Sequence, residues 1–215
     1  MSTNYFSKGY LSKHTMTYGG KGYAVNKPPK KRGLRLLIVG IFVLGGWQVL
    51  NSGYMLAKAH LSQWMIADAW ALTLKDGEAH PPWSWADTHP VAKLTVPSLN
   101  QSSYILAGAS GRNMAFGPAH VYQSGMPGTS KTTVFSGHND SHFNYLAAIS
   151  SGDVIEVETL KGVFNYQVSD LRIVDSREEQ ITIQNADQLV LTTCYPFDAL
   201  TAGGPLRFQI TAERF

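Results

Sequence analysis

An apolar run without a single charge, residues 36–56, constrains this chain more than any other feature. About 20 predominantly apolar residues cross a bilayer as a helix, and glycines such as Gly40 and Gly45 are tolerated there. Four basic residues precede the run: Lys30, Lys31, Arg32 and Arg35. Because basic flanks stay on the cytoplasmic side, the run predicts an uncleaved single-pass anchor with the N-terminus inside and residues 57–215 outside.

Two other interpretations of this run are a buried core helix and a cleaved signal peptide. A core helix would not come with the basic flank, and a signal peptide would start nearer the N-terminus with a small-residue cleavage site, which we do not find before Tyr54. The basic flank belongs to a longer segment, because residues 1–35 hold eight basic residues and no acidic one. We interpret residues 1–35 as a solvated, disordered cytoplasmic tail.

The net charge of +3 therefore belongs to the tail, since the rest of the chain has ten basic and fifteen acidic residues. A nucleic-acid function is disfavoured, because it would need basic residues interleaved with aromatic ones on a folded surface. Residues 57–90 are predicted to join the anchor to a domain. A helix is expected over 57–75, with Trp64 and Trp70 as either membrane-interface anchors or packing residues, and three prolines make 80–90 an extended linker.

From residue 91 onward the chain has the composition of short strands separated by turns. Many short strands with such turns are typical of a β-sandwich or a closed β-barrel, and one short helix is expected over 142–149. The expected strands are 91–96, 104–108, 132–137, 153–159, 163–168, 171–175, 188–194 and 206–213.

Cys194 is the only cysteine, which excludes a disulfide or a cysteine-based zinc cluster within the chain. It ends the expected strand 188–194. A lone cysteine is more often a small buried hydrophobic residue than a nucleophile. A free thiol outside the cytoplasm, however, is exposed to oxidation, so a reactive role is the alternative.

Two further residues could act with this thiol. His138 follows the expected strand 132–137, with His120 and His142 as competitors for its role, and Arg207 lies on the last expected strand. A thiolate can attack a carbonyl, an imidazolium can protonate the leaving amine, and a guanidinium can stabilise the oxyanion. A set of Cys, His and Arg therefore suits acyl transfer through a thioester.

Three segments carry a resemblance to a known family: TTVFSGHND (132–140), LVLTTCYPF (189–197) and PLRF (205–208). In this order they resemble the sortase family of cysteine transpeptidases. The stretch from 91 to 120, with SGHNDSHF, is similar to the sortases of Gram-negative, often marine, proteobacteria. The resemblance implies an all-β fold: an eight-stranded sortase-like β-barrel with short helices over 91–215, preceded by the N-terminal transmembrane helix.

The resemblance also implies an activity, in which a C-terminal sorting signal of the LPxTG kind is cut between Thr and Gly and the acyl group passes to an amine. Matched to the family's motifs, Cys194 is the nucleophile, His138 the general acid and base, and Arg207 the group that stabilises the carbonyl or oxyanion. The implied partners are a substrate protein with a sorting signal, an amine acceptor and the membrane. In a Gram-negative cell the anchor lies in the inner membrane and the barrel in the periplasm.

One departure from the family is Asn139, where relatives commonly carry Arg. Acidic residues show no clustering that would predict a calcium site, and we expect no metal and no cofactor. An extended peptide is expected to lie in a groove lined by Thr193, Ala115, Phe116 and Tyr195. The Gly- and Pro-rich loop 111–130 would shape that groove or stand free in solvent.

Other functions are distinguished by residue order and by one substitution. An L,D-transpeptidase usually has a histidine close before the cysteine in an SHGC-type motif, which is absent, and papain-like peptidases place Cys before His. A non-enzymatic alternative is a membrane-anchored β-domain that binds a partner or spaces an assembly in the envelope. Such a domain would be indifferent to Cys194→Ser.

Overall fold

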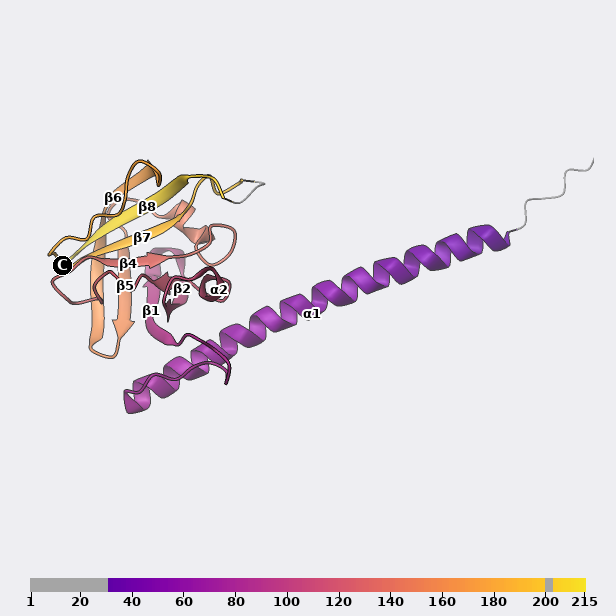
Figure 1. The fold of residues 1–215 in the computed structure, drawn as a ribbon, viewed down its shortest axis with the longest axis horizontal. Coiled ribbons are helices and arrows are strands. Elements are labelled where there is room, and N and C mark those ends of the chain that lie inside the picture. Colours follow the sequence, from indigo (N-terminus) through magenta and orange to yellow (C-terminus); the bar gives the residue numbers. More distant parts are fainter. Residues whose placement is uncertain (1–30, 200–202) are drawn as a thin grey trace, which may run out of the picture. The chain divides into compact units, whose positions relative to one another are not determined.

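The computed structural model describes residues 31–199 and 203–215, so most of the expected tail, residues 1–30, lies outside the described residues. A long helix, α1 (Arg32–Asp76), precedes a set of short strands (Figure 1). The strands are β1 (Pro90–Val96), β2 (Gln101–Ala107), β3 (Ala119–His120), β4 (Thr133–Ser136), β5 (Val154–Thr159), β6 (Gly162–Asp175), β7 (Gln188–Cys194) and β8 (Leu206–Arg214). The short helices are η1 (Pro97–Leu99), α2 (Gly111–Met114) and η2 (Asn144–Ala148).

The strands close into one barrel in the order β1-β2-β3-β4-β7-β8-β6-β5, which confirms the expected eight-stranded all-β fold. Strands β2 and β3 pair in parallel, as do β4 and β7, and the other neighbours are antiparallel. Closure removes the free strand edges that would otherwise invite aggregation. Strands β4, β7 and β8 lie side by side in the barrel wall (Figure 1).

The strand count agrees with the expectation, but two of its members differ. The expected strands 163–168 and 171–175 form the single strand β6, whose pairing with β8 shifts register between Val168 and Asp170. Such a bulge interrupts the alternation of a continuous strand. Strand β3 is not among the expected strands, because a strand of two residues is too short to show a hydrophobic period in the sequence. The expected helix over 142–149 is the 3-10 helix η2.

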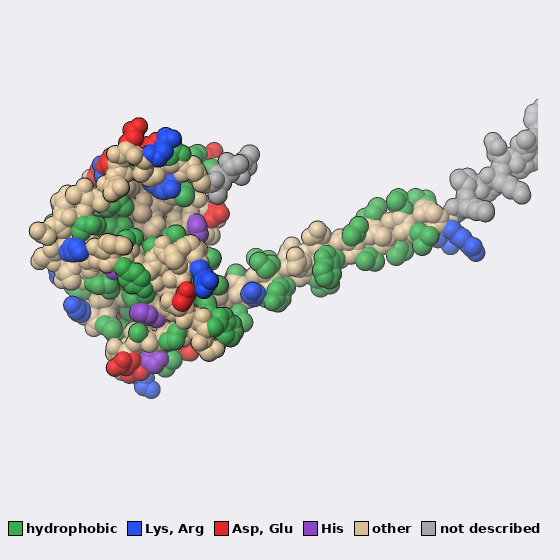
Figure 2. Space-filling model, in the orientation of Figure 1, with side chains coloured by type: hydrophobic (Ala, Val, Ile, Leu, Met, Phe, Trp, Pro, Cys, Tyr) green, Lys and Arg blue, Asp and Glu red, His purple; other side chains and the backbone are tan. Residues whose placement is uncertain are grey.

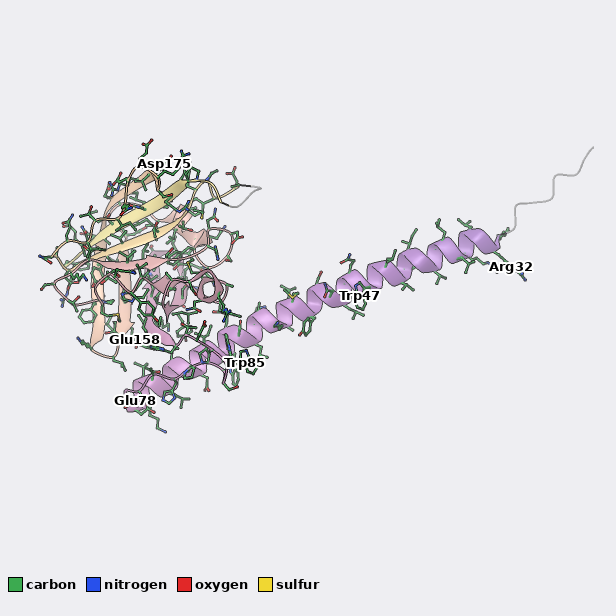
Figure 3. The ribbon with its side chains drawn as sticks, viewed as in Figure 1. Arg32, Trp47, Glu78, Trp85, Glu158 and Asp175 are labelled. Carbon is green, nitrogen blue, oxygen red and sulfur yellow. The ribbon has the colours of Figure 1, made fainter. Side chains whose placement is uncertain are left out.

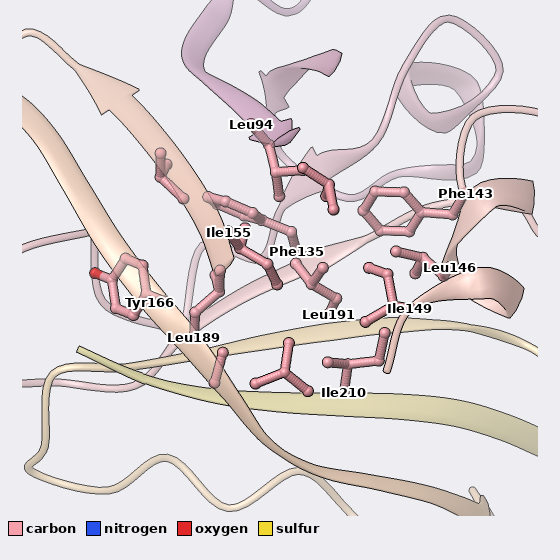
Figure 4. Close-up of a cluster of buried hydrophobic side chains, with 14 of the residues drawn as sticks. Leu94, Phe135, Phe143, Leu146, Ile149, Ile155, Tyr166, Leu189, Leu191 and Ile210 are labelled. Atoms are coloured by element: carbon pink, nitrogen blue, oxygen red, sulfur yellow. The ribbon is translucent and has the colours of Figure 1, made fainter. Parts of the chain in front are cut away.

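The barrel interior is filled by alternate residues of the strands, as a strand with one buried face requires. Leu94, Phe135, Ile155, Leu191 and Ile210 are all fully buried in this cluster (Figure 4). Burying a side chain of this size stabilises the fold by roughly 1.5–3 kcal/mol. The packed core thus fixes the relative positions of the strands that carry the candidate site.

The chain divides into two units, Met1–Gln48 and Val49–Phe215, with α1 contributing to both. Large apolar side chains between Leu34 and Leu56 are exposed along the helix, and Arg32 marks its N-terminal end (Figures 2 and 3). By length and composition α1 can cross a membrane. The helix therefore suggests a single-pass anchor, and the bounds 36–56 stay a prediction.

The C-terminal part of α1 belongs to the barrel unit. Ile66, Ala69, Trp70 and Thr73 lie on one helical face and are buried. The indole N–H of Trp70 donates to Glu158 of β5 at 3.3 Å. Trp70 is therefore a packing residue, which settles one of the alternatives left open by the sequence.

Candidate active site

The pairing of three strands brings the predicted catalytic residues to one place. Cys194 of β7 lies opposite Arg207 of β8, and Ser136 of β4 lies beside Thr192 of β7. Since side chains alternate along a strand, Thr192 and Cys194 share one face. His138 follows Ser136 by two residues, just beyond the end of β4, and lines the same pocket as Cys194.

These side chains line a pocket of about 490 Å³ on the outer face of the barrel wall. His138, Cys194 and Arg207 are each half-buried in it. Gln209, Met114 and the segment 179–181 complete much of the lining. The structure thus brings all three residues together, as a shared catalytic role requires, and their individual roles stay predictions.

The backbone before His138 is anchored from the strand that carries the cysteine. The Thr193 hydroxyl donates to the Gly137 carbonyl at 2.7 Å, and the Gly137 N–H donates to the Thr192 carbonyl at 3.2 Å. A Cβ on residue 137 would approach the Phe143 ring to 2.8 Å, so glycine is required there. These contacts fix where the chain leaves β4 and therefore where His138 begins.

A second link joins the loops that follow the histidine and the cysteine. The Asn139 side-chain amide donates to the Pro196 carbonyl at 2.9 Å. The Asn144 amide donates to the Asn139 carbonyl at 3.3 Å, which folds the loop back on itself. In the sequence, Asn139 is notable only as a departure from the family. Its contact with Pro196 could not be predicted, because it joins two loops that are far apart in the chain.

Arg207 is held at the rim of the pocket by backbone carbonyls. Its Nη1 donates to the carbonyls of Gly204 and Leu206 at 2.6 and 2.9 Å. Nearby, hydrogen bonds from Arg177 lower the pKa of Asp175 to about 2, and the charge of Arg207 contributes in the same direction. A carboxylate that stays ionised at neutral pH therefore accompanies the guanidinium at this rim.

The two competing histidines lie elsewhere. The ring Nε2 of buried His120 is 2.9 Å from the Gly125 carbonyl and 3.1 Å from the Ser124 hydroxyl. Burial is the main cause that lowers the pKa of His142, and the charge of His138 lowers it further. His142 borders a separate hollow against α1. Within the described residues, neither histidine lines the pocket of Cys194.

Unlike the three predicted catalytic residues, the residues predicted to bind substrate do not lie together in one pocket. Thr193 borders the pocket, but only 2% of its surface is exposed, and its hydroxyl already donates a hydrogen bond to the Gly137 carbonyl. Ala115 and Phe116 border the hollow against α1, which has a volume of about 360 Å³. The Tyr195 ring packs edge-on against Phe197, with centroids 6.3 Å apart. The substrate-binding roles of these residues stay predictions.

A second hollow of about 700 Å³ continues the pocket along the outer face of the barrel. The two hollows share Ser136, Ile181 and Thr192, so they form one groove that runs over β4 and β7. Asp87 and Asn113 lie in the second hollow. An elongated groove with Cys194 in one part of it can accept an extended peptide.

Comparison with known proteins places this geometry in a family. The sortase family model, described as a sortase domain, matches residues 94–215, more than half of the chain. The chain therefore belongs to the sortase family. The narrower resemblance to proteobacterial sortases stays a prediction.

Relatives and solved structures agree with this assignment. Over 123 residues the chain is 31% identical to sortase D of Bacillus subtilis (strain 168), a match that covers 56% of this chain and 62% of that protein, less than two thirds of its length. The lid mutant of sortase A from Corynebacterium diphtheriae superposes with a TM-score of 0.53 at 24% identity, covering 61% of this chain and 73% of that one. Streptococcus agalactiae sortase C1 gives 0.52 at 22% identity, covering 72% and 86%. Both structures support the barrel fold.

Proposed function

We propose that the protein is a membrane-anchored cysteine transpeptidase that cleaves a C-terminal sorting signal of the LPxTG kind and transfers the acyl group to an amine. The observation that carries the proposal is the position of Cys194 opposite Arg207, with His138 lining the same pocket, in a chain of the sortase family. A thiol, an imidazole and a guanidinium within one groove suit acyl transfer.

In the proposed first half-reaction, the Cys194 thiolate attacks the carbonyl carbon of the scissile peptide bond. The Arg207 guanidinium donates a hydrogen bond to the developing oxyanion, as oxyanion-hole donors do. Protonated His138 gives its proton to the leaving amine as the C–N bond breaks. The products are a thioester on Cys194, a released amine and neutral His138.

In the second half-reaction the acceptor amine attacks the thioester carbonyl. Neutral His138 takes a proton from the attacking nitrogen, and the C–S bond breaks to release the Cys194 thiolate. A new amide bond forms, and the starting ion pair of thiolate and imidazolium is restored. Water in place of the amine would give hydrolysis, so the acceptor's access to the groove decides between transfer and hydrolysis.

The proposed setting follows from the anchor. With residues 1–35 in the cytoplasm and 36–56 in the inner membrane, residues 57–90 lead to the catalytic barrel 91–215 in the periplasm. Arg32 and Arg35 at the start of α1 support this orientation, because basic residues favour the cytoplasmic side. A substrate protein held in the same membrane by its own apolar helix would present its sorting signal close to the barrel.

The test uses the full chain in detergent with a fluorescent sorting peptide and a small amine acceptor. Wild type is expected to release the C-terminal fragment and to form a thioester adduct, seen as a mass increase that hydroxylamine removes. Cys194→Ala is expected to do neither. Leu160→Ala, an exposed residue in the β5–β6 turn, serves as the matched control and retains both.

Equal processing of the peptide by wild type and Cys194→Ala would show that the protein is not a cysteine transpeptidase. Binding of the peptide without cleavage, unchanged in Cys194→Ser, would instead favour an envelope binding or assembly module.

A further inference from the structure

A patch of apolar and aromatic side chains lies where the barrel unit begins. We name it the juxtamembrane patch, and it is formed by Leu61 and Met65 of α1 together with Trp83, Trp85 and Phe116, with Lys58 and Ser62 of α1 beside them. These residues line a hollow of about 260 Å³. The Trp83 and Phe116 rings pack edge to face with centroids 4.8 Å apart.

The outer member of the patch is unusually exposed for its size. Trp85, which lies beside α1 in Figure 3, is 83% exposed. Leu61 is 54% exposed. Exposed apolar patches on a protein surface mark sites of interaction. The core of the barrel gains nothing from a tryptophan in this position, so packing does not explain it.

The loop that carries Trp85 is fixed to the barrel. The Ala86 N–H donates to the Trp83 carbonyl at 2.9 Å, which closes a turn around Trp85. At the end of the loop the Thr88 hydroxyl donates to the Ala107 carbonyl at 2.8 Å. Trp85 is therefore presented on an ordered turn, at little cost in conformational entropy when it binds something.

The height of the patch along α1 indicates what covers it. At a rise of 1.5 Å per residue, Lys58 and Leu61 lie about 3 and 7.5 Å beyond Leu56, the last residue of the apolar run. The headgroup layer on each side of a bilayer is roughly 5–8 Å thick. Trp85 shares its hollow with these two residues and with Met65, about 13.5 Å beyond Leu56 at the same rise, so the membrane-facing edge of the hollow lies in that layer, where tryptophan is enriched.

Along α1, the charges near the patch fit the same environment, and the exposed Asp87 beside Trp85 is paired with Arg112 at 3.4 Å. Between Val49 and Ala67 the only Lys, Arg, Asp or Glu is Lys58, and the first acidic residue of α1 is Asp68. The Lys58 ammonium lies over the Tyr54 ring at 5.9 Å from its centroid. A long lysine side chain can keep its stem among lipid tails and its charge among the headgroups.

We propose that the juxtamembrane patch is a second membrane contact, in which Trp85 enters the headgroup layer beside α1. The inference rests on the proposed anchor. The Gln63 side chain donates to the Phe116 carbonyl at 2.6 Å, and Phe116 follows the pocket residue Met114 by two positions. The contact thus holds the Cys194 pocket at a set height and orientation above the lipid, where a sorting signal next to a substrate's own membrane helix would be presented.

The experiment measures tryptophan fluorescence of the full chain in vesicles of phosphatidylcholine and phosphatidylglycerol, with and without lipids brominated near the headgroup. The emission of Trp85 is obtained as the difference between wild type and Trp85→Phe. Trp64→Phe is the matched control, because Trp64 is 66% exposed and lies about 12 Å beyond Leu56 at the helical rise. Trp47→Phe reports on the anchor itself with lipids brominated deeper in the chain.

The proposal expects the Trp85 emission to lose most of its intensity in brominated vesicles and little to aqueous acrylamide, with the reverse for Trp64. Quenching of Trp85 by acrylamide alone would show a water-exposed loop and overturn the proposal. Protection of Trp85 from both quenchers would show a protein partner, such as a second copy, and also overturn it. If Trp47 were not quenched by lipid, the anchor would fail first and the patch proposal with it.

Discussion

The two faces of the sheet formed by strands β7 and β8 have different surroundings. On the inner face, Leu191 and Thr193 lie opposite Ile210 and Phe208, and Leu191 and Ile210 are fully buried in the core. On the outer face, Cys194 lies opposite Arg207 in the pocket. The two faces share one set of backbone hydrogen bonds. A step of one residue therefore separates a side chain that stabilises the barrel from one that lines the pocket.

The largest expected effects come from one substitution on each face. Cys194→Ala is expected to reduce peptide cleavage to background, because it removes the proposed nucleophile, while the free energy of unfolding changes by less than about 1 kcal/mol, as is usual away from the core. Leu191→Ala is expected to cost about 2–5 kcal/mol of stability by leaving a cavity. Thermal unfolding and fluorescent-peptide assays measure the two quantities.

The division between the faces would break if Cys194→Ala unfolded the barrel, since the thiol would then be a packing residue.

The next effect tests the geometry of the outer face. Arg207→Ala is expected to lower kcat by about 10²–10³-fold, the loss typical of one oxyanion donor. Arg207→Lys keeps the charge but not the planar fork, so it should recover only part of the rate. Steady-state kinetics with the sorting peptide measure both variants. Full activity in Arg207→Lys would show that only the positive charge of this residue is needed, and not the geometry of its guanidinium group.

A smaller effect tests the residue that links the faces. Thr193→Val removes the hydroxyl that donates to Gly137 and is expected to cost about 1–3 kcal/mol by leaving a buried carbonyl without that partner. It should also lower kcat, because His138 follows Gly137. Thr193→Ser keeps the donor and is the control. A rise in KM with unchanged stability would instead support the predicted substrate contact.

The smallest expected effect is a pH dependence of the free energy of unfolding, caused by a histidine on the inner face of the barrel. His120 lies opposite the core residue Phe135, and burial lowers its pKa from 6.5. The unfolded chain therefore binds more protons than the folded one below pH 6.5, and stability falls as the pH drops through the lowered folded value. Burial lowers the pKa of His89 and His142 in the same direction.

Unfolding of the full chain in detergent, followed at several pH values between 7.5 and 5, measures this slope. The pKa of Asp175 is also lowered, but its contribution is lost only below its ordinary value of 3.8. The slope above pH 5 therefore reports the histidines. His120→Gln is expected to make it shallower, and an unchanged slope would show that His120 does not contribute.

The sequence predicted much of this molecule because its signals are local. Strand β7 was expected over the residues it occupies, and the apolar run 36–56 lies within α1. Strand β3 and the continuity of β6 were not predicted. The two residues of β3 show no period, and a bulge such as that near Val168 interrupts the period of a continuous strand.

The candidate site divides in the same way. The chemical types of Cys194, His138 and Arg207 could be chosen from motifs, and the structure places all three on one pocket. The positions of Ala115 and Phe116 could not be inferred from their nearness in sequence to a functional loop, because α2 turns them toward α1.

By itself, the amino-acid sequence determined the apolar helix, the strand-rich composition and the single thiol, because each depends on neighbouring residues or on residue type. Only the tertiary structure decided that Cys194 faces Arg207 and that Asn139 reaches Pro196. Those relations depend on the register of strands far apart in the chain, and register is set by the packing of the whole core.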